Sequence, residues 1–168
     1  MARVNQKYEA NSFFGIGILN NVDELNIGTL WRSAYILGAS FIFTVDRKYK
    51  AQSSDVTSAW TKIPLYHYKN IAELKSNLPY STRLVGVEMT EDSTALSEFV
   101  HPARAVYLLG NEQIGLSANL LNECHSVISL PGNFSMNVAV VGSILMYDRV
   151  TKIQSVLPQN ANLITPKI

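Results

Sequence analysis

The sequence predicts a single α/β domain with a mostly parallel sheet flanked by helices. Apolar runs with the length and branched composition of buried strands alternate with segments of helical spacing. This alternation continues along the whole chain, with no internal repeat and no low-complexity linker. Strands that alternate with helices are typical of a parallel sheet covered on both faces. A chain of 168 residues is long enough for one domain with a sizeable core.

The first half of the chain supplies three predicted strands and two predicted helices. The strands have buried, branched or aromatic composition and are expected over Phe13–Leu19, Ser40–Val45 and Leu65–Tyr68. The helices are expected over Ile27–Leu37, closed by Gly38, and over Ile71–Leu78, capped by Asn70. Residues 51–62 are polar and predict no more than a helical turn or two around Ser54–Trp60.

The second half continues the pattern and ends in an apolar helix. We expect strands over Leu84–Met89, Val106–Leu109 and Val127–Leu130, a weak helix over Ala95–Val100, and a helix over Val138–Tyr147. The last helix is apolar on nearly every side, which predicts that protein surrounds it. We assign residues 1–152 to the domain and residues 153–168 to an extended or partly loose tail.

Two polar, glycine-bearing loops follow the strands at Val106–Leu109 and Val127–Leu130. The first loop spans Gly110–Gly115 and the second spans Pro131–Asn137. We expect the two strands to be adjacent and their loops to converge at one edge of the sheet, which is where open α/β sheets bind ligands. Two ordinary turns between strands and helices are an equally good interpretation of this stretch alone.

Composition restricts the function only loosely. A net charge of +1 neither requires nor excludes a nucleic-acid partner, which a local basic patch or a dimer groove would have to hold. The single cysteine, Cys124, cannot form a disulfide within the chain and favours a reducing compartment. The N-terminus lacks the apolar region of a signal peptide, and no apolar run reaches about 18 residues. We therefore expect a soluble, cytoplasmic protein with no membrane partner.

Several familiar sites are disfavoured. No ATPase-type phosphate loop occurs, and the dinucleotide-like Gly15-x-Gly17 lies inside an apolar run with Asn20 at the third glycine position. No Gly-x-Ser-x-Gly motif supports a hydrolase. The three histidines lack metal-ligand spacing, so no metal site is expected. Cys124 beside His125 could suggest thiol catalysis, but a core cysteine at the end of a short helix is the better interpretation.

The remaining candidates are polar residues next to predicted strand ends: Asn26, Arg32, Glu112, Ser135 and Asn137. Arg32 lies in an otherwise apolar helix, and a buried or half-buried arginine needs an anionic partner. The six-residue spacing from Asn26 predicts that both side chains can face the sheet edge. Arg32 could be a phosphate clamp, a structural partner of Glu112 or Asp23, or simply solvated.

These polar residues belong to three short motifs: NIGTLWR at residues 26–32, GNEQIGL at residues 110–116 and SMNV at residues 135–138. The three resemble, in order, Asn-x-Gly-x-x-x-Arg, Gly-x-Glu-x-x-Gly-Leu and Ser-Leu-Asn-Val. These are the motifs of the SpoU/TrmH-type RNA ribose 2′-O-methyltransferases of the SPOUT superfamily, which this chain resembles. The motifs stand in the family's order and cover about residues 13–152. The chain departs from the family in having Glu24-Leu25 where a proline often precedes the first motif, and Leu130-Pro131 where Ile-Pro is common.

The resemblance implies a C-terminal trefoil knot, a homodimer that completes the active site, and S-adenosylmethionine as cofactor. The implied catalytic residues are Arg32, Asn26, Glu112, Ser135 and Asn137. The implied cofactor contacts, largely from the backbone, are Leu109, Gly110, Glu112, Gly115, Ile128, Leu130, Ser135, Met136, Asn137 and Ala139. Guanidinium stays protonated, so we expect Arg32 to hold phosphate and stabilise an oxyanion while phosphate or water assists proton removal.

The implied reaction is methylation of a ribose 2′-hydroxyl in structured RNA. RNA contacts are expected from Arg32, Arg47, Lys48 and Lys50, with Arg3 and Lys7 as further candidates, although a basic turn is more often a solvated surface. The compact chain resembles members that modify the tRNA anticodon loop, which favours tRNA over rRNA. Two alternatives remain open: a catalytically inactive RNA-binding protein of the same fold, and a nucleotide-cofactor oxidoreductase.

Overall fold

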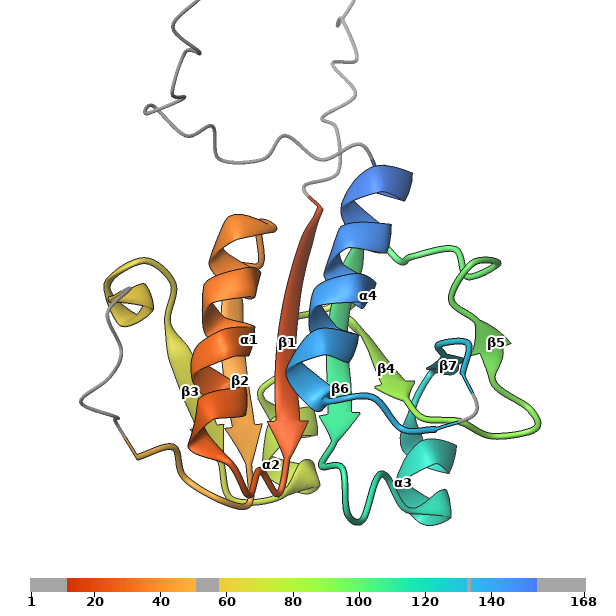
Figure 1. Cartoon of the computed structure of the whole chain (residues 1–168), viewed down its shortest axis with the longest axis horizontal. Coiled ribbons are helices and arrows are strands. Elements are labelled where there is room, and N and C mark those ends of the chain that lie inside the picture. The colour runs from red at the N-terminus through yellow and green to blue at the C-terminus, as the bar shows by residue number, and fades with distance from the viewer. Residues whose placement is uncertain (1–11, 51–57, 133, 154–168) are drawn as a thin grey trace, which may run out of the picture.

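The computed structural model describes residues 12–50, 58–132 and 134–153, which form one sheet with helices on both faces (Figure 1). The strands are β1 (Phe13–Leu19), β2 (Phe41–Val45), β3 (Leu65–Tyr68), β4 (Arg83–Val87), β5 (Thr94–Ala95), β6 (Arg104–Gly110) and β7 (Ser126–Ser129). The helices are α1 (Glu24–Ile36), the 3₁₀ turn η1 (Ala59–Thr61), α2 (Ile71–Ser76), α3 (Ala118–Glu123) and α4 (Val138–Ile153). The predicted single α/β domain is confirmed.

The strand order of the described sheet is β3-β2-β1-β6-β4-β7-β5, and every pairing is parallel. The expectation that the strands at Val106–Leu109 and Val127–Leu130 are adjacent is wrong, because β4 pairs with both β6 and β7. β7 lies between β4 and β5 in the sheet. The last strand of the described chain is therefore inserted between two strands that follow each other in sequence. The trefoil knot stays a prediction, because strand order alone does not define threading.

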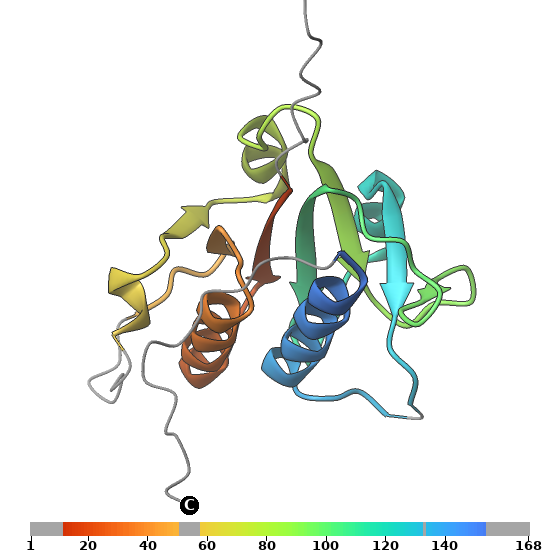
Figure 2. The same ribbon diagram turned by 90° about the horizontal axis from the view of Figure 1, so that it is seen from above.

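Helices α1 and α4 lie side by side on one face of the sheet (Figure 2). They bury alternate residues of the central strands, among them Ile16, Tyr107 and Leu109. Gly142 of α4 faces this layer so closely that a Cβ there would lie 2.4 Å from Leu30 Cδ1. The same face therefore has the larger of the two apolar clusters and a close contact between α1 and α4.

Helices α2 and α3 cover the opposite face, where the other set of alternate strand residues is buried (Figure 2). Two glycines of β1 make room for aromatic rings on this face. A Cβ at Gly17 would lie 2.2 Å from the Phe43 carbonyl oxygen, and one at Gly15 would lie 2.3 Å from the Phe41 ring. Packing against β2 therefore accounts for the Gly15-x-Gly17 pair that superficially resembles a dinucleotide fingerprint.

Some predicted boundaries are confirmed and others shift. The strands at Phe13–Leu19 and Leu65–Tyr68 have the predicted bounds, and Asn70 caps α2 by accepting from the Glu73 N–H. Helix α1 begins three residues before the predicted start, because Asp23 caps it by accepting from the Leu25 N–H. Asn26 consequently lies in the first turn of α1 instead of in the preceding loop.

The predicted weak helix over Ala95–Val100 is wrong. Thr94 and Ala95 form the short strand β5 beside β7, and the Leu96 N–H donates to the Ser129 carbonyl. Lys152 of α4 donates through Nζ to the carbonyl oxygens of Leu96, Ser97 and Phe99. These contacts with β7 and α4 compete with the weak local helical preference of the segment.

Helix α4 is only half covered, so the expectation that protein surrounds it is wrong for the single chain. Val138, Ala139, Leu145 and Met146 are buried, whereas Val140, Ile144 and Tyr147 are 46%, 41% and 63% exposed. The exposed three recur at helical spacing and form one apolar stripe. α4 also extends to Ile153, one residue beyond the assigned domain boundary. Residues 154–168 of the predicted tail, Arg3, Lys7 and most of the 51–62 segment lie outside the described residues.

A buried polar network fixes the C-terminal half of α4 at the amino edge of the sheet. Arg149 is 1% exposed and donates to the carbonyl oxygens of Pro102, Phe13 and Ala103, to Ser12 Oγ and to Tyr107 Oη. His101 is joined to Tyr107 Oη through Nδ1 and to Asp148 through Nε2. The network ties α4 to β1 and β6, far from the carboxyl edge where the predicted site lies.

Candidate active site

The carboxyl ends of β4, β6 and β7 bring three loops together beside the start of α4 (Figure 1). The loops after β6 and β7 converge, as predicted, even though β4 separates their strands. They converge because parallel strands all end at the same edge of the sheet. The loop after β4, which begins at Glu88, is a third component that the sequence interpretation missed.

The Gly110–Gly115 loop is a tight, internally bonded turn. Asn111 is buried, its Oδ1 accepts from the N–H groups of Gln113 and Ile114, and its Nδ2 donates to the Asn20 carbonyl. A Cβ at Gly110 would lie 2.4 Å from the Gly115 carbonyl carbon, so the two ends of the loop are in contact. Gly115 has φ +65°, a left-handed conformation that glycine adopts without strain.

The Glu88 carboxylate, from the loop after β4, is hydrogen-bonded to the end of the Gly110–Gly115 loop. Its Oε2 accepts from the Leu116 N–H at 2.8 Å, and its Oε1 accepts from the Met89 N–H at 3.0 Å. A Cβ at Gly115 would lie 2.4 Å from Glu88 Oε2. A larger residue at position 115 would therefore displace the Glu88 carboxylate, and it would also strain the left-handed backbone there. The sequence interpretation had placed Glu88 inside a strand over Leu84–Met89, whereas β4 ends at Val87.

Asn26, Glu112 and Asn137 form a hydrogen-bonded cluster from three distant parts of the chain. Asn26 Nδ2 donates to Glu112 Oε1 at 2.9 Å, and Asn137 Nδ2 donates to Asn26 Oδ1 at 2.8 Å and to Glu112 Oε1 at 3.3 Å. The Val138 N–H also donates to Glu112 Oε1, at 3.2 Å. Glu112 Oε1 thus accepts hydrogen bonds from three donors, and the three motif residues fix one another's side-chain positions.

Asn137 also begins α4. Its Oδ1 accepts from the N–H groups of Ala139 at 2.9 Å and Val140 at 3.3 Å, so two free donors of the first turn are satisfied. Both amide atoms of Asn137 are therefore hydrogen-bonded, the oxygen to the first turn of α4 and the nitrogen to Asn26 and Glu112. This double role explains why an asparagine suits the third motif.

The converging loops enclose a cavity of about 540 Å³, a volume typical of small-molecule sites. Seven of the predicted cofactor contacts line it: Leu109, Gly110, Glu112, Gly115, Leu130, Ser135 and Met136. The other three do not line it: Ile128 and Ala139 are buried in the core, and Asn137 lies in the hydrogen-bonded cluster. Glu112 belongs to both cavity and cluster, so the two features form one site.

The described lining of the cavity combines apolar side chains with two carboxylates and with the neutral polar residues Thr90, Asn111, Gln113, Ser129 and Ser135, and it contains neither Lys nor Arg. Glu88 and Glu112 would repel the pyrophosphate of a nicotinamide or flavin dinucleotide. A nucleoside with a positively charged group fits this lining better. Ser135 is exposed at the cavity wall, where its hydroxyl is accessible to a ligand.

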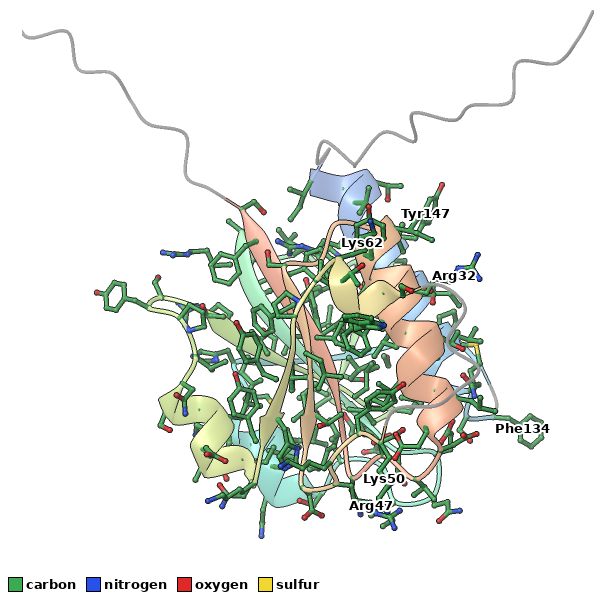
Figure 3. All side chains as sticks on the ribbon, turned by 90° about the vertical axis from the view of Figure 1, so that its left-hand side faces the viewer. Arg32, Arg47, Lys50, Lys62, Phe134 and Tyr147 are labelled. Carbon is green, nitrogen blue, oxygen red and sulfur yellow. The ribbon has the colours of Figure 1, made fainter. Side chains whose placement is uncertain are left out.

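Arg32 lies apart from the cluster and is exposed, which excludes a structural pairing with Glu112 or Asp23 and leaves the phosphate-clamp and solvated alternatives open (Figure 3). The spacing argument was wrong because six residues rotate the helix by about 240° beyond a full turn and advance it by about 9 Å. Asn26 therefore faces the cluster and Arg32 faces outward. Within the described chain, no salt bridge joins Arg32 to Glu112 or Asp23.

The other predicted RNA contacts, Arg47, Lys48 and Lys50, are exposed on the turn after β2. Figure 3 shows Arg47 and Lys50 at the carboxyl end of the sheet. The turn begins with Asp46 at φ 72°. The structure thus leaves these cations accessible at the same edge as the cavity.

The disfavoured chemistries remain without support. Burial raises the pKa of the Cys124 thiol to about 11, which opposes thiolate formation. His125 Nδ1 accepts from the Leu84 N–H, so it has a structural partner. Across the described ranges, no group of three or more His, Cys, Asp or Glu residues could hold a metal ion. In the same ranges, no helix has the length and apolar character needed to cross a membrane.

Residues 16–147 match the model of the SpoU rRNA Methylase family. The tRNA (guanosine(18)-2'-O)-methyltransferase TARBP1 of Mus musculus is 28% identical over 137 residues, which are 73% of this chain and 8% of that protein. The mitochondrial rRNA methyltransferase 1 of Schizosaccharomyces pombe is 29% identical over 147 residues, or 76% of this chain and 48% of that protein. The chain thus spans less than half the length of either curated relative.

Solved structures share the fold. The A. aeolicus TrmH/SpoU tRNA modifying enzyme aligns with a TM-score of 0.76 and 17% identity, over 85% of this chain and 76% of that one. A protein from a study of 2-OH methylation of C/U34 on tRNA aligns with a TM-score of 0.73 and 19% identity, over 86% of this chain and 99% of that one. The SpoU methyltransferase AviRb from Streptomyces viridochromogenes, in complex with the cofactor AdoMet, aligns with a TM-score of 0.70 and 22% identity, over 90% of this chain and 62% of that one.

Proposed function

Because the chain belongs to the SpoU rRNA methylase family, we propose that it methylates a ribose 2′-hydroxyl in structured RNA, with S-adenosylmethionine as methyl donor. The observation that carries this proposal is the Asn26–Glu112–Asn137 cluster at the wall of the 540 Å³ cavity. It joins all three motifs at one point beside a space of suitable size. Ser135, Asn26, Glu112 and Asn137 act there by positioning the nucleotide and the cofactor.

The cavity suits S-adenosylmethionine by its chemistry. Backbone at Gly110, Gly115 and Leu130 can contact adenine and ribose without charged side chains, and the apolar walls can cover the adenine ring. The carboxylates of Glu88 and Glu112 favour a cationic ligand over a phosphorylated one. The structurally similar SpoU methyltransferase AviRb was solved in complex with AdoMet, which supports S-adenosylmethionine as the cofactor of this chain.

The bound cofactor supplies a methyl group on a positively charged sulfur; an oxygen–carbon bond forms as the sulfur–carbon bond breaks. The chain's own residues must align the hydroxyl with that methyl group and handle the proton of the hydroxyl. Arg32 stays protonated, so we assign it to hold the RNA phosphate and stabilise the developing oxyanion. The proton leaves to that phosphate or to water.

Arg32 can perform this role only if a second copy completes the site, because it faces away from the Asn26–Glu112–Asn137 cluster of its own chain. We therefore propose a homodimer. The apolar stripe Val140, Ile144 and Tyr147 of α4 is the surface that supports it, and Tyr147 lies on the same side of the molecule as Arg32 (Figure 3). In this dimer Arg32 of one chain serves the cavity of the other.

The target and the compartment are further proposals. We favour tRNA over rRNA because the likeness to the protein studied for 2-OH methylation of C/U34 on tRNA covers 99% of that protein. Arg47, Lys48 and Lys50 would add sequence-independent phosphate contacts. We propose a cytoplasmic location from the single cysteine, which cell fractionation tests directly.

Calorimetric titration with S-adenosylmethionine and S-adenosylhomocysteine tests the function first. We expect saturable binding with one site per chain, both for the unaltered protein and for Arg32→Ala. Labelled methyl transfer to unfractionated tRNA and rRNA, followed by nucleoside analysis for 2′-O-methyl products, tests the reaction. Cofactor binding without transfer would favour an inactive RNA-binding protein, and copurifying nicotinamide or flavin would favour an oxidoreductase. Absence of cofactor binding at high micromolar concentration would refute the proposal.

A further inference from the structure

Three exposed apolar side chains surround the mouth of the cavity. Met89, Ile114 and Phe134 are 50%, 70% and 85% exposed, and all three line the cavity. They come from the loops after β4, β6 and β7 respectively. Figure 3 shows Phe134 extending from the body of the molecule. We refer to these three residues as the apolar rim.

The apolar rim is unusual because three exposed apolar side chains line the same cavity. Single exposed apolar residues are ordinary on protein surfaces, whereas apolar residues gathered around one cavity indicate a binding surface. An aromatic ring at 85% exposure forgoes most of the burial that usually stabilises it. The rim therefore indicates a planar or apolar ligand group that covers it in the working protein.

The position of Phe134 identifies which part of a ligand this is. Phe134 precedes Ser135, which lies at the cavity wall, and it is three residues from Asn137 of the polar cluster. The ribose that receives the methyl group must approach the junction of cavity and cluster. Its nucleobase then extends outward from that junction toward the rim, while the cofactor occupies the interior of the cavity.

We propose that Phe134, supported by Ile114 and Met89, stacks against the nucleobase of the nucleotide that is methylated, and that this nucleotide must be unpaired. The proposal rests on the proposed function and adds a specificity-determining residue to it. Stacking of unpaired bases on exposed aromatic rings is the usual way in which proteins bind single-stranded RNA, and it tolerates any base. A base inside a duplex presents no free face to the ring.

Charge favours RNA as the occupant over a second protein surface. The described rim residues are uncharged, and the exposed cations Arg47 and Lys50 lie at the same edge of the sheet as the cavity (Figure 3). A nucleotide has both complementary parts, a flat base for the rim and a phosphate for the cations. An apolar protein segment would satisfy only the rim.

Phe134→Ala tests the proposal, with Phe134→Trp as the conservative variant and Tyr80→Ala as a matched control. Tyr80 is 91% exposed and lies in the turn before β4, at the opposite edge of the sheet. With whichever RNA the unaltered protein methylates, we expect KM for RNA to rise about ten-fold in Phe134→Ala. Phe134→Trp should restore it, Tyr80→Ala should leave it unchanged, and the Kd for S-adenosylmethionine should stay the same in all three.

A second measurement tests the unpaired state. Annealing a complementary DNA oligonucleotide across the mapped methylation position should prevent transfer, and an oligonucleotide annealed elsewhere should not. An unchanged KM in Phe134→Ala, or continued methylation inside the duplex, would overturn the inference. Weaker cofactor binding would instead assign Phe134 to the cofactor, and dimer dissociation measured by ultracentrifugation would assign it to the partner chain; both would also overturn it. If the unaltered protein binds no cofactor or transfers no methyl group, the proposed function itself fails.

Discussion

Glu112 Oε1 accepts a hydrogen bond from Asn26 Nδ2 at 2.9 Å across 86 positions of sequence. The two residues come from different elements, the first turn of α1 and the loop after β6, and Asn137 bonds to both. This contact joins the first and second motifs without passing through Arg32. The hydrogen-bonded cluster of Asn26, Glu112 and Asn137 is therefore complete without Arg32.

Replacing Glu112 by Ala should abolish methyl transfer while the fold survives. The change leaves Asn26 Nδ2, Asn137 Nδ2 and the Val138 N–H without their acceptor. We expect a fall in kcat of at least about 100-fold and a loss of about 1–3 kcal/mol in unfolding free energy. Single-turnover kinetics and urea denaturation measure the two effects. A normal kcat in a folded Glu112→Ala variant would contradict the assigned role.

Mixing two inactive variants should restore activity if Arg32 serves the partner's site. In a mixed dimer whose arginines act in trans, the Arg32→Ala and Glu112→Ala defects fall in the same active site, which leaves the other site intact. Random exchange of chains should give about a quarter of normal activity, because half of the dimers are mixed and each has one intact site. Transfer is measured after co-refolding. No recovery, with exchange verified by tagged chains, would mean that both residues act within one chain.

Gly115→Ala should weaken cofactor binding, whereas Gly28→Ala should not. At position 115 the new methyl group would meet Glu88 Oε2 at 2.4 Å in a left-handed backbone conformation, which costs about 1–2 kcal/mol before any clash. At position 28, inside α1, nothing lies within 4 Å of the new methyl group, and alanine should stabilise the helix by about 0.5–1 kcal/mol. Titration calorimetry and thermal denaturation distinguish the two. Equal cofactor affinity in both variants would count against the role of the Glu88–Gly115 contact.

Arg149→Met should destabilise the fold without changing the active site. Arg149 is 1% exposed, and its guanidinium serves five acceptors at the amino edge of the sheet. Loss of these charge-assisted bonds should cost about 3–5 kcal/mol. Arg149→Lys keeps the charge but not the planar set of donors, so it should restore only part of the stability. Urea denaturation measures the loss, and the cofactor Kd of the folded fraction should remain normal.

Stability should fall in acid because of His101. Burial lowers the pKa of His101 below its usual value of 6.5, against the opposing effect of the Asp148 hydrogen bond and carboxylate. The unfolded chain therefore binds a proton more readily than the folded chain, so unfolding is favoured as pH drops below about 6.5. Arg149 and Lys152 also disfavour the protonated form. Denaturation midpoints measured between pH 5 and 8 should show this slope, and His101→Gln should reduce it.

The sequence predicted those features that depend on neighbouring residues. Apolar runs identified β1 and β3 with their observed bounds, and Asn70 identified the start of α2. The three motifs identified Asn26, Glu112 and Asn137 as candidate site residues, and the structure joins them directly by hydrogen bonds. These predictions succeeded because strand composition, helix caps and motif spacing are local properties of the chain.

Tertiary structure alone decided which segments lie together and which faces are covered. β4 separates β6 from β7, Thr94–Ala95 pairs as a strand instead of beginning a helix, and Glu88 supports Gly115 from another loop. Arg32 faces outward, and α4 keeps an exposed apolar stripe. Strand order and burial depend on contacts between residues that are distant along the chain, and the periodicity of a single segment contains no information about them.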